Sequence, residues 1–447
     1  MIKGALVLLA LASPARGDDH GEPAPPRTSV DRMQQLEDEL ARLKDDNTAL
    51  ERRVDELGRV SVQLSGYLDV GLFATTGDGA GTRSDVGNLN FPEYAGIVPG
   101  SWVFMGDPLS TTVNARGEPA DTGESRAVTF DPIDSRGKST FLVNALNLGL
   151  LVGIGDAASL VGSVDFVPRG RDVSNPMGLF LGDYLDVKLA YAEWRPAVES
   201  VSLALQVGKL DSVLGREYRA LESPDRTTVT PSLICRYICG RPIGVKARAK
   251  TLDDALILNV AVTNGGHGIE GFPFSDETDT NEVKTIAGRL SYLLGKQLDL
   301  GVSGAFGAQD LQPDDGVRQW HIGGDLHLDW NDVELTAEIV HGRANGKTSD
   351  VACDLAPCIH YTGAYCLLSY RWTNVLEPYV RVDWRDAVHR SGASFVYISQ
   401  LVRVTAGVRA ELGAHVIVKA EGTHDRELGR IPQFPNDVVT TSLVIKY

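Results

Sequence analysis

The feature that most constrains this chain is a hydrophobic period of two residues, repeated over most of its length. In the first such segment Val62, Leu64 and Leu68 share one face, while Gln63 and Asp69 share the other. This pattern is typical of a β-strand that has one face in an apolar environment and the other in a polar environment. We count about sixteen segments of roughly ten residues, the length that a tilted strand needs to cross a bilayer. The pattern predicts an all-β chain.

The connections between these segments alternate between short and long. Tight turns on one side and long loops on the other are typical of an antiparallel up-and-down transmembrane barrel. A soluble sandwich or propeller also has many such strands, but gives no reason for strict alternation of loop length. We therefore predict a barrel of about 16 strands spanning residues 61–447. The short connections are 155–157, 196–199, 253–254, 295–297, 330–332, 373–375 and 412–414, and the long ones lie near 74–138, 168–183, 212–242, 265–282, 308–317, 344–359, 386–398 and 424–437.

Composition agrees with two-faced strands. The longest purely apolar run, Ala5 to Ala12, is far too short for a spanning helix, and mean hydropathy is close to zero. A closed barrel crosses a membrane without a continuous apolar segment, because its strands satisfy each other's backbone hydrogen bonds. The net charge of −16 argues against nucleic-acid binding, which needs a basic face. Interfacial aromatic girdles are predicted at Trp194, Trp320, Trp330, Trp372 and Trp384.

The N-terminus indicates export. Residues 1–17 combine Lys3, a short apolar core and small residues, which is the pattern of a secretory signal peptide cleaved after Ala15 or Gly17. Residues 18–29, rich in proline and glycine, are typical of a linker.

Residues 30–58 have a different period and predict a helix. Apolar residues recur three and four apart, which favours a self-associating periplasmic coiled coil over an amphipathic helix packed on its own protein. Asparagine at a core heptad position often accompanies dimers, so the stalk's stoichiometry stays open. The predicted oligomerisation residues are Leu36, Leu40, Leu43, Asn47, Leu50 and Val54, flanked by Met33 and Leu57.

The five cysteines fit an exported protein. Cys235 with Cys239, and Cys353 with Cys358, form close pairs in polar stretches, which favours disulfides over zinc ligation because no second pair follows at ligand spacing. Cys366 is left as a small apolar residue in a strand.

The chain resembles Gram-negative outer-membrane porins of the sixteen-stranded trimeric type. Three features carry the resemblance: the last strand, Val439 to Tyr447, ends on an aromatic residue; Val207 to Arg216 precedes a long third loop as in phosphate-selective and related specific porins; and a heptad stalk precedes the barrel. The Pro-Glu-Phe-Gly tip of general porins and a long arginine ladder are both missing, so selectivity is not inherited. The resemblance implies an outer-membrane location, passive diffusion of small hydrophilic solutes or ions, anions such as phosphate among them, and no cofactor. It implies as partners membrane lipid and lipopolysaccharide, and further copies of the chain in a trimer.

In such porins the third loop folds inward and narrows the pore. Here residues 212–242 are basic in an acidic chain, and the next strand adds three cations on its polar face. An acidic set lies about four strands further round. We predict a constriction with a basic wall and an acidic wall, which would orient dipolar solutes and favour anions weakly; merely solvated lumen charges are the alternative. The basic residues are Arg216, Arg219, Arg226, Arg236, Arg241, Lys246, Arg248 and Lys250, and the acidic ones are Asp325, Asp329, Glu334 and Glu338.

Other functions are weaker readings of the sequence. The acidic residues within 265–282 could form a Ca²⁺ site or belong to a solvated surface loop. The loop is favoured, because the spacing of a calcium-binding loop is missing. No metal site is therefore predicted. No serine is tied to a histidine by spacing, so we predict no enzyme. The main alternative to a pore is a structural or binding barrel with a periplasmic stalk and little or no conductance.

Overall fold

The structure is a computed structural model and describes residue 44 and residues 60–75, 104–105, 139–166, 185–264, 282–295, 297–308, 318–344, 358–391, 394–428 and 437–447. The predicted signal peptide, linker and coiled coil lie outside this part of the chain, apart from Lys44, which is helical. The acidic stretch 265–281 and Cys353 also lie outside it. Those assignments stay predictions.

Strands dominate the described residues. Successive side chains of a strand point to opposite faces of the sheet, and here one face is largely apolar and the other largely polar. The strands are β1 (Val60–Thr75), β2 (Phe104–Met105), β3 (Thr140–Ile154), β4 (Ala158–Phe166), β5 (Leu185–Trp194), β6 (Ser202–Lys209), β7 (Ile243–Thr251), β8 (Leu256–Thr263), β9 (Thr285–Leu294), β10 (Leu298–Ala308), β11 (Arg318–Trp330), β12 (Val333–Ala344), β13 (Cys358–Tyr370), β14 (Leu376–Ser391), β15 (Ser394–Glu411), β16 (Val416–Glu427) and β17 (Val438–Lys446).

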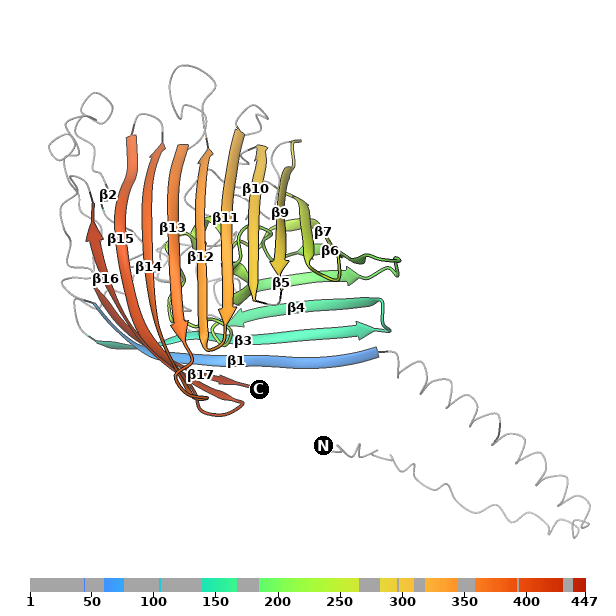
Figure 1. The fold of residues 1–447 in the computed structure, drawn as a ribbon, viewed down its shortest axis with the longest axis horizontal. Helices are drawn as coiled ribbons and strands as arrows, with labels where there is room; N and C mark the ends of the chain where they lie inside the picture. Colours follow the sequence, from blue (N-terminus) through green and yellow to red (C-terminus); the bar gives the residue numbers. More distant parts are fainter. Residues whose placement is uncertain are drawn as a thin grey trace, which may run out of the picture. The chain divides into compact units, whose positions relative to one another are not determined.

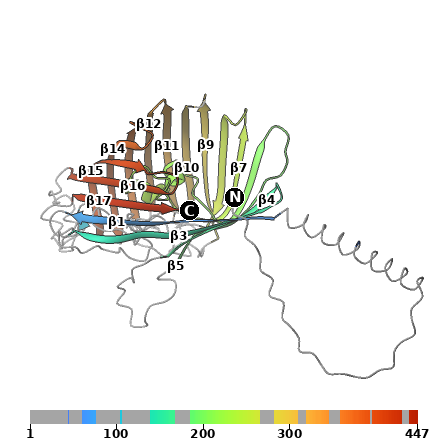
Figure 2. The ribbon, with the colours of Figure 1, turned by 90° about the horizontal axis from the view of Figure 1, so that it is seen from below.

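The long strands close into a barrel. Each from β3 to β17 pairs antiparallel with the next, and β1 joins β3 on one side and β17 on the other. Within the described residues β2 is a two-residue strand that pairs in parallel with β15 and adds nothing to the closure. The remaining sixteen strands confirm the predicted barrel. Figures 1 and 2 show β9 to β15 standing side by side along one part of it.

The two faces of the sheet differ as the period of two predicts. On β11, Ile322 is 55% exposed on the outer face, whereas Asp325 on the inner face is 6% exposed. Outer-face residues are largely apolar, and inner-face residues include most of the buried charged side chains. Among the described residues no helix is long and apolar enough to cross a membrane.

The short connections follow the prediction. Seven tight turns join β3–β4, β5–β6, β7–β8, β9–β10, β11–β12, β13–β14 and β15–β16. In two of them Asn331, with φ of 56°, and Gly295, with φ of 64°, take the left-handed conformation that tight hairpin turns require.

One predicted long loop is wrong. Residues 386–398 belong largely to strands, because β14 continues to Ser391 and β15 begins at Ser394. The alternating backbone pairing extends past the point where the polar residues suggested a loop. As a result Trp384, expected near a strand end, lies in the middle of β14, while Trp320 and Trp330 lie near the two ends of β11.

Candidate functional site: a loop folded inside the barrel

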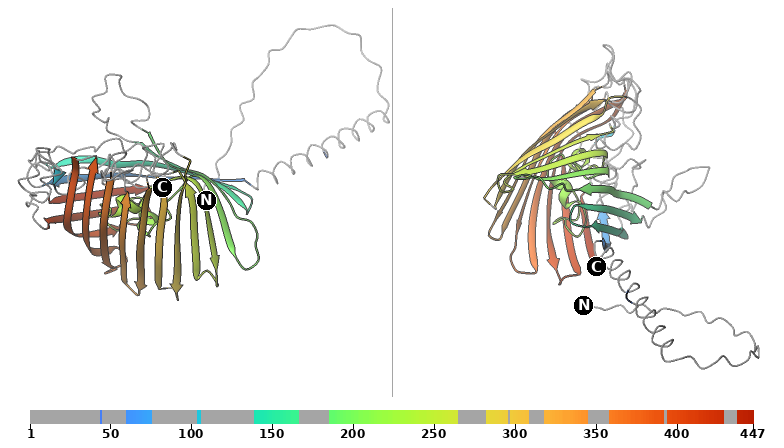
Figure 3. Two further views of the ribbon diagram at one scale, coloured as in Figure 1. Left: turned by 90° about the horizontal axis from the view of Figure 1, so that it is seen from above. Right: turned by 90° about the vertical axis from the view of Figure 1, so that its right-hand side faces the viewer.

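The connection between β6 and β7, residues 210–242, folds into the interior of the barrel. It contains a 3-10 turn, η4 (Glu217–Ala220), and a single helical turn, α3 (Cys235–Ile238). Leu210, Leu214 and Ile234 are fully buried although they belong to a connection between strands. Leu214 and Ile234 pack in one cluster with inner-face side chains of the strands, and Figure 3 shows the yellow-green segment with the short helices within the ring of strands.

Residues 233–239, the apolar segment, pack against one side of the lumen. Tyr237 stacks on Tyr361 of β13 with ring centroids 3.8 Å apart. Small inner-face residues leave room for this segment, which explains why the lumen face of β8, β9 and β14 carries alanine at this level. The cluster also includes Val213, Leu214, Leu221, Ala261, Ala287, Val340, Tyr365 and Ala387.

A disulfide closes the helical turn of the apolar segment. Cys235 and Cys239 are bonded, with Cα atoms 5.0 Å apart, as the sequence predicted. The Cys239 amide also donates to the Cys235 carbonyl at 2.7 Å. The Glu217 carboxylate lies close to both sulfurs. Because the sulfurs are joined to each other and are not thiolates, this group is not a metal centre.

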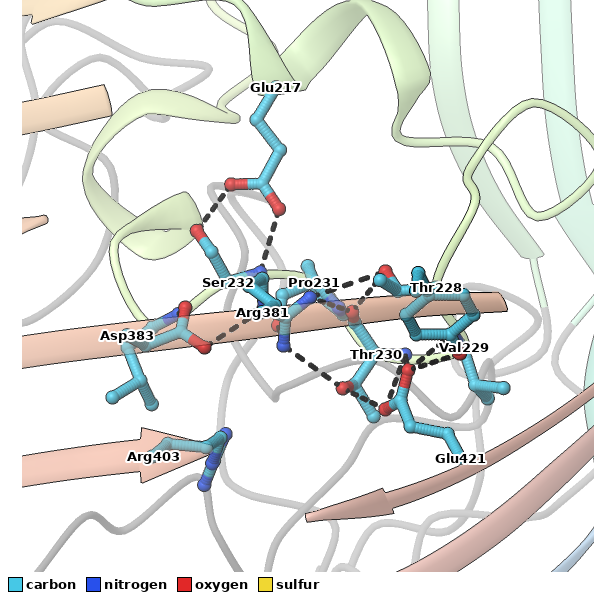
Figure 4. Close-up of polar contacts among 12 residues, drawn as sticks. Glu217, Thr228, Val229, Thr230, Pro231, Ser232, Arg381, Asp383, Arg403 and Glu421 are labelled. Atoms are coloured by element: carbon cyan, nitrogen blue, oxygen red, sulfur yellow. Dashed lines mark hydrogen bonds and ion pairs between the residues drawn. The ribbon is translucent and has the colours of Figure 1, made fainter. Parts of the chain in front are cut away.

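Residues 222–232, the polar segment, are held by charged side chains of β14 and β16 (Figure 4). The Arg381 guanidinium donates to the carbonyls of Thr230 at 2.6 Å and Pro231 at 2.9 Å, and pairs with Asp383 at 2.8 Å. Glu421 accepts from the Val229 amide at 2.8 Å. Side chains from strands far away in the sequence therefore form direct hydrogen bonds with the backbone of the loop.

The start of the polar segment is tied to two other strands, β1 and β5. Glu222 accepts hydrogen bonds from Tyr67 of β1 at 2.5 Å, Lys188 of β5 at 2.6 Å and Arg241 at 2.7 Å. Burial by itself raises the pKa of Glu222, but the charges of Lys188 and Arg241 outweigh it and lower the pKa to about 2. Ser223 also donates to Asp69 of β1 at 2.5 Å. The carboxylate of Glu222 is thus a charged anchor at neutral pH.

The turn η4 is positioned by Glu338 of β12. Its carboxylate accepts from the backbone amides of Arg216 at 2.9 Å and Glu217 at 2.6 Å, and from the Tyr365 hydroxyl at 2.8 Å. The Arg216 side chain reaches Asp299 of β10 at 2.6 Å. Burial raises the pKa of the Glu217 carboxyl.

Two cavities remain beside the loop, with volumes of about 630 and 570 Å³. Arg219 and Asp225 of the loop border both of them. The larger adjoins β11 to β15 and is lined by His327, Glu334 and Arg371 among others. The smaller adjoins β5 to β8. Both reach residues near the short turns, so the loop separates two water-accessible spaces at that side of the barrel.

The predicted basic residues fall into three groups. Lys246, Arg248 and Lys250 share the inner face of β7 and line the smaller cavity together with Arg219 and Arg241. Arg216 and Arg226 stabilise the position of the loop. Arg226 is 5% exposed and donates to the loop carbonyls of Leu221, Thr228 and Val229. The side chain of Arg236 is outside the described part of the structure.

The predicted acidic residues lie together on β11 and β12 but differ in environment. Asp325 is opposite Glu338 and Asp329 is opposite Glu334 in the strand register. Asp325 is buried against Arg289, 2.5 Å away, and Glu338 is buried under the loop. Asp329 is exposed, and half-buried Glu334 lines the larger cavity. Asp325 and Glu338 therefore have fixed protein partners, whereas Asp329 and Glu334 face the water-accessible interior.

Sequence reasoning missed most of the anchors. The anchors are polar or charged side chains on the inner face of strands that the sequence predicted. Arg381, Asp383 and Arg385 alternate along β14, so their spacing places them on one face of the strand. The other missed anchors are Tyr67, Asp69, Lys188, Asp299, Lys419 and Glu421. Arg289, which pairs with Asp325 of β11 and Asp299 of β10, was missed as well.

A closed antiparallel barrel with an apolar outer face and a charged interior defines a transmembrane β-barrel of the outer-membrane class. The family model described as "Putative beta-barrel porin-2, OmpL-like" matches residues 170–444, more than half of the chain. The chain belongs to this family. It is a porin-type barrel of the bacterial outer membrane, as the resemblance implied.

Several solved structures of outer-membrane proteins have a fold similar to that of this chain. The outer-membrane channel DcaP of Acinetobacter baumannii is 13% identical, with 87% of this chain and 98% of that chain covered and a TM-score of 0.55. OmpF of Salmonella typhi, in complex with daunomycin, is 12% identical, with coverages of 86% and 97% and a TM-score of 0.50. A loop-deletion mutant of OmpT, an outer-membrane protein of Vibrio cholerae, is 10% identical, with coverages of 87% and 100% and a TM-score of 0.50. No curated protein matches the chain.

Proposed function

We propose that this barrel is a passive diffusion pore for small hydrophilic solutes or ions, narrowed by residues 210–242. The observation that carries the proposal is the loop itself, which is held inside a charged lumen and leaves a cavity on each side of Arg219. A polar, water-accessible interior suits hydrated solutes. The many fixed contacts of the loop suit a constriction of constant shape.

We infer a weak preference for anions along the β7 side. Six basic and four acidic side chains line the smaller cavity. Arg241 is paired with Glu222, Arg195 with Glu193 and Lys250 with Asp254. The exposed Arg248 therefore contributes most of the excess positive charge toward the water. On the other wall, Asp325 is paired with Arg289, which leaves a weaker opposing acidic surface. Fixed charges beside a narrow path bias ion flow.

Reversal potentials across a salt gradient in planar bilayers test this preference. The double variant Arg248→Gln/Lys250→Gln should shift selectivity toward cations, because it removes two positive charges from that wall. The matched double variant Asp329→Asn/Glu334→Gln should shift it toward anions. A cation preference that the first variant leaves unchanged would overturn the inferred role of the β7 wall.

A barrel with little or no conductance is the competing function. It is favoured by the spread of the loop anchors over β1, β5, β14 and β16, which brings the loop to several sides of the lumen. Single-channel recording of the purified full-length protein separates the two. Discrete conductance steps support the pore; a silent barrel that gains conductance on deletion of residues 222–232 supports a binding or structural role.

A further inference from the structure

Two buried amide side chains line the smaller cavity, which adjoins β5 to β8. Gln206 of β6 is 8% exposed and Asn259 of β8 is 4% exposed. Among the described residues, the carbonyl oxygen Oε1 of Gln206 and the amide nitrogen Nδ2 of Asn259 have no hydrogen-bond partner. Buried polar atoms in proteins are nearly always paired, so an unpaired acceptor and an unpaired donor in the wall of one cavity indicate groups that a bound solute satisfies.

The orientation of the Gln206 amide is fixed by its other end. Its nitrogen Nε2 donates to the Glu193 carboxylate at 2.5 Å, and Glu193 pairs with Arg195. Because an ionised carboxylate only accepts hydrogen bonds, Gln206 must present its nitrogen to Glu193. Its carbonyl oxygen is therefore left as an acceptor, and the cavity wall offers an acceptor as well as donors.

Arg248 of β7 lies in the sheet between the two amides. It is the cross-strand neighbour of Asn259 on β8 and of Ala204 on β6, while Gln206 is opposite Lys246, two residues further along β7. Arg248 is exposed, and it forms no ion pair with any side chain that the structure describes. Ala204 is small, so it leaves space beside the guanidinium group.

The acidic side chains of this cavity do not cancel the charge of Arg248. Glu193 and Glu222 are each paired with an arginine. Asp225 is exposed and borders both cavities, but Arg219 does the same and offsets its charge. Burial raises the pKa of the Asp211 carboxyl, which disfavours its charged form. The site therefore favours an anionic group next to Arg248.

These groups define the chemistry of the solute. A guanidinium fork and an adjacent amide N–H suit a carboxylate, and an amide oxygen without a partner suits a hydroxyl donor. From the strand spacing, the backbones at Gln206 and Asn259 are about 10 Å apart across the strands and about 7 Å along them. A solute that contacts both must be several atoms long. The cavity volume of about 570 Å³ is in the range of small-molecule sites.

We propose that the smaller cavity binds sugar acids, which carry a carboxylate and several hydroxyl groups on one short chain or ring. Arg248 and Asn259 bind the carboxylate, and Gln206 accepts a hydrogen bond from a hydroxyl group of the solute. This assignment rests on the pore function proposed above and names the class of solute that the β7 side admits. Positive charge alone does not separate sugar acids from other anions, whereas the Gln206 acceptor does.

Equilibrium dialysis of the purified full-length protein in detergent, with labelled D-gluconate, tests the assignment. The unlabelled competitors are sorbitol, which has the hydroxyl groups without the carboxylate, and butyrate, which has a carboxylate without hydroxyl groups. Wild-type protein should bind gluconate at least tenfold more tightly than either competitor. Arg248→Gln should weaken gluconate binding about tenfold, because it removes a charge-assisted hydrogen bond. Asn259→Asp, which keeps the shape but places a negative charge beside the carboxylate, should weaken it at least as much.

Gln206→Met has a different expected signature. It removes the acceptor for the hydroxyl group, so it should lower the advantage of gluconate over butyrate about fivefold. General damage to the cavity would weaken both solutes together and leave this ratio unchanged. An unchanged ratio in Gln206→Met would therefore overturn the assignment of the hydroxyl-binding group.

The matched control is Arg371→Gln, which removes one exposed cation from the wall of the larger cavity and should change gluconate binding less than twofold. Equal weakening by Arg371→Gln and Arg248→Gln would reduce the effect to the net charge of the lumen and overturn the site. Planar-bilayer recording separates this site from the pore function. A silent barrel that binds gluconate supports the site and contradicts the pore, whereas a conducting barrel that binds gluconate and butyrate equally retains the pore and overturns the site.

Discussion

The two segments of the inner loop are held by different forces. The apolar segment, residues 233–239, packs against β8 to β14 through rings and aliphatic groups and is closed by its own disulfide. The Leu233 amide also donates a hydrogen bond to Asp383 of β14 at 3.1 Å. The polar segment, residues 222–232, is held through hydrogen bonds and ion pairs to β1, β5, β14 and β16. The apolar segment is attached mainly by packing, which depends little on pH or salt. The polar segment gives its backbone a defined direction across the lumen.

The comparison shows why the lumen carries so many buried charges. Packing alone is non-directional and leaves a loop backbone free to shift. The arginine fork and the carboxylates accept or donate at fixed angles, so they specify one position for the loop. Buried polar groups of this kind are costly to disrupt once formed.

The largest effect is expected from Arg381→Met. The substitution leaves the Asp383 carboxylate without its ion partner and frees the carbonyls of Thr230 and Pro231. Breaking one buried pair in this way should cost about 4 kcal/mol. Hydrogen exchange of peptides covering 222–232 should accelerate strongly, whereas peptides covering 233–239 should change less. Arg381→Lys should restore only part of the protection, because an ammonium group does not reproduce the fork. Equal acceleration of both segments would show that they form one unit.

Ile238→Ala probes the apolar segment. Ile238 is fully buried in the cluster, and its truncation should destabilise the loop by about 3 kcal/mol through lost burial and a cavity. The expected pattern of hydrogen exchange is the reverse of that for Arg381→Met, with the larger change in residues 233–239. The effect should be the same at low and high salt. A strong salt dependence would contradict an attachment made mainly by packing.

Removal of the disulfide should have a smaller effect. Cys235 and Cys239 are only four residues apart, so the bond restricts a short stretch of the unfolded chain and contributes about 2 kcal/mol in the chain-entropy description. The double variant Cys235→Ser/Cys239→Ser should retain the loop inside the barrel with a noisier single-channel current. A current identical to that of the wild type would show that the packing of α3 suffices.

The smallest effect is expected from mild acid. The pKa of Glu222 is lowered to about 2, so its anchor is fully present above pH 4.5 and is lost only as the pH falls through about 2. Glu217 has the opposite sign, because burial raises its pKa and acid therefore relieves the cost of its charge. Conductance between pH 7 and pH 4 should change less than about twofold. A steep loss of the conducting state near pH 5 would contradict the assignment of Glu222 as a charged anchor.

Much of the fold was predictable from local pattern. The period of two and the sorting of connection lengths predicted the sixteen strands and the inner face of β7. The close spacing of Cys235 and Cys239 in an exported chain predicted their disulfide. The boundary between β14 and β15 was not predictable, because polar residues occur both in loops and on the lumen face of a strand. The same ambiguity hid Arg381 and Asp383, whose period fits the strand but whose partners lie about 150 residues earlier in the chain.

The sequence by itself determined that this chain forms a two-faced barrel, because side-chain alternation along each strand is a local property. Only the tertiary structure decided which charges face water and which hold the loop. Asp325 and Asp329 look equivalent in sequence, yet one is buried against Arg289 and the other is exposed. The difference arises because the position of a loop inside a closed barrel depends on contacts between strands far apart in the chain, and no local pattern records them.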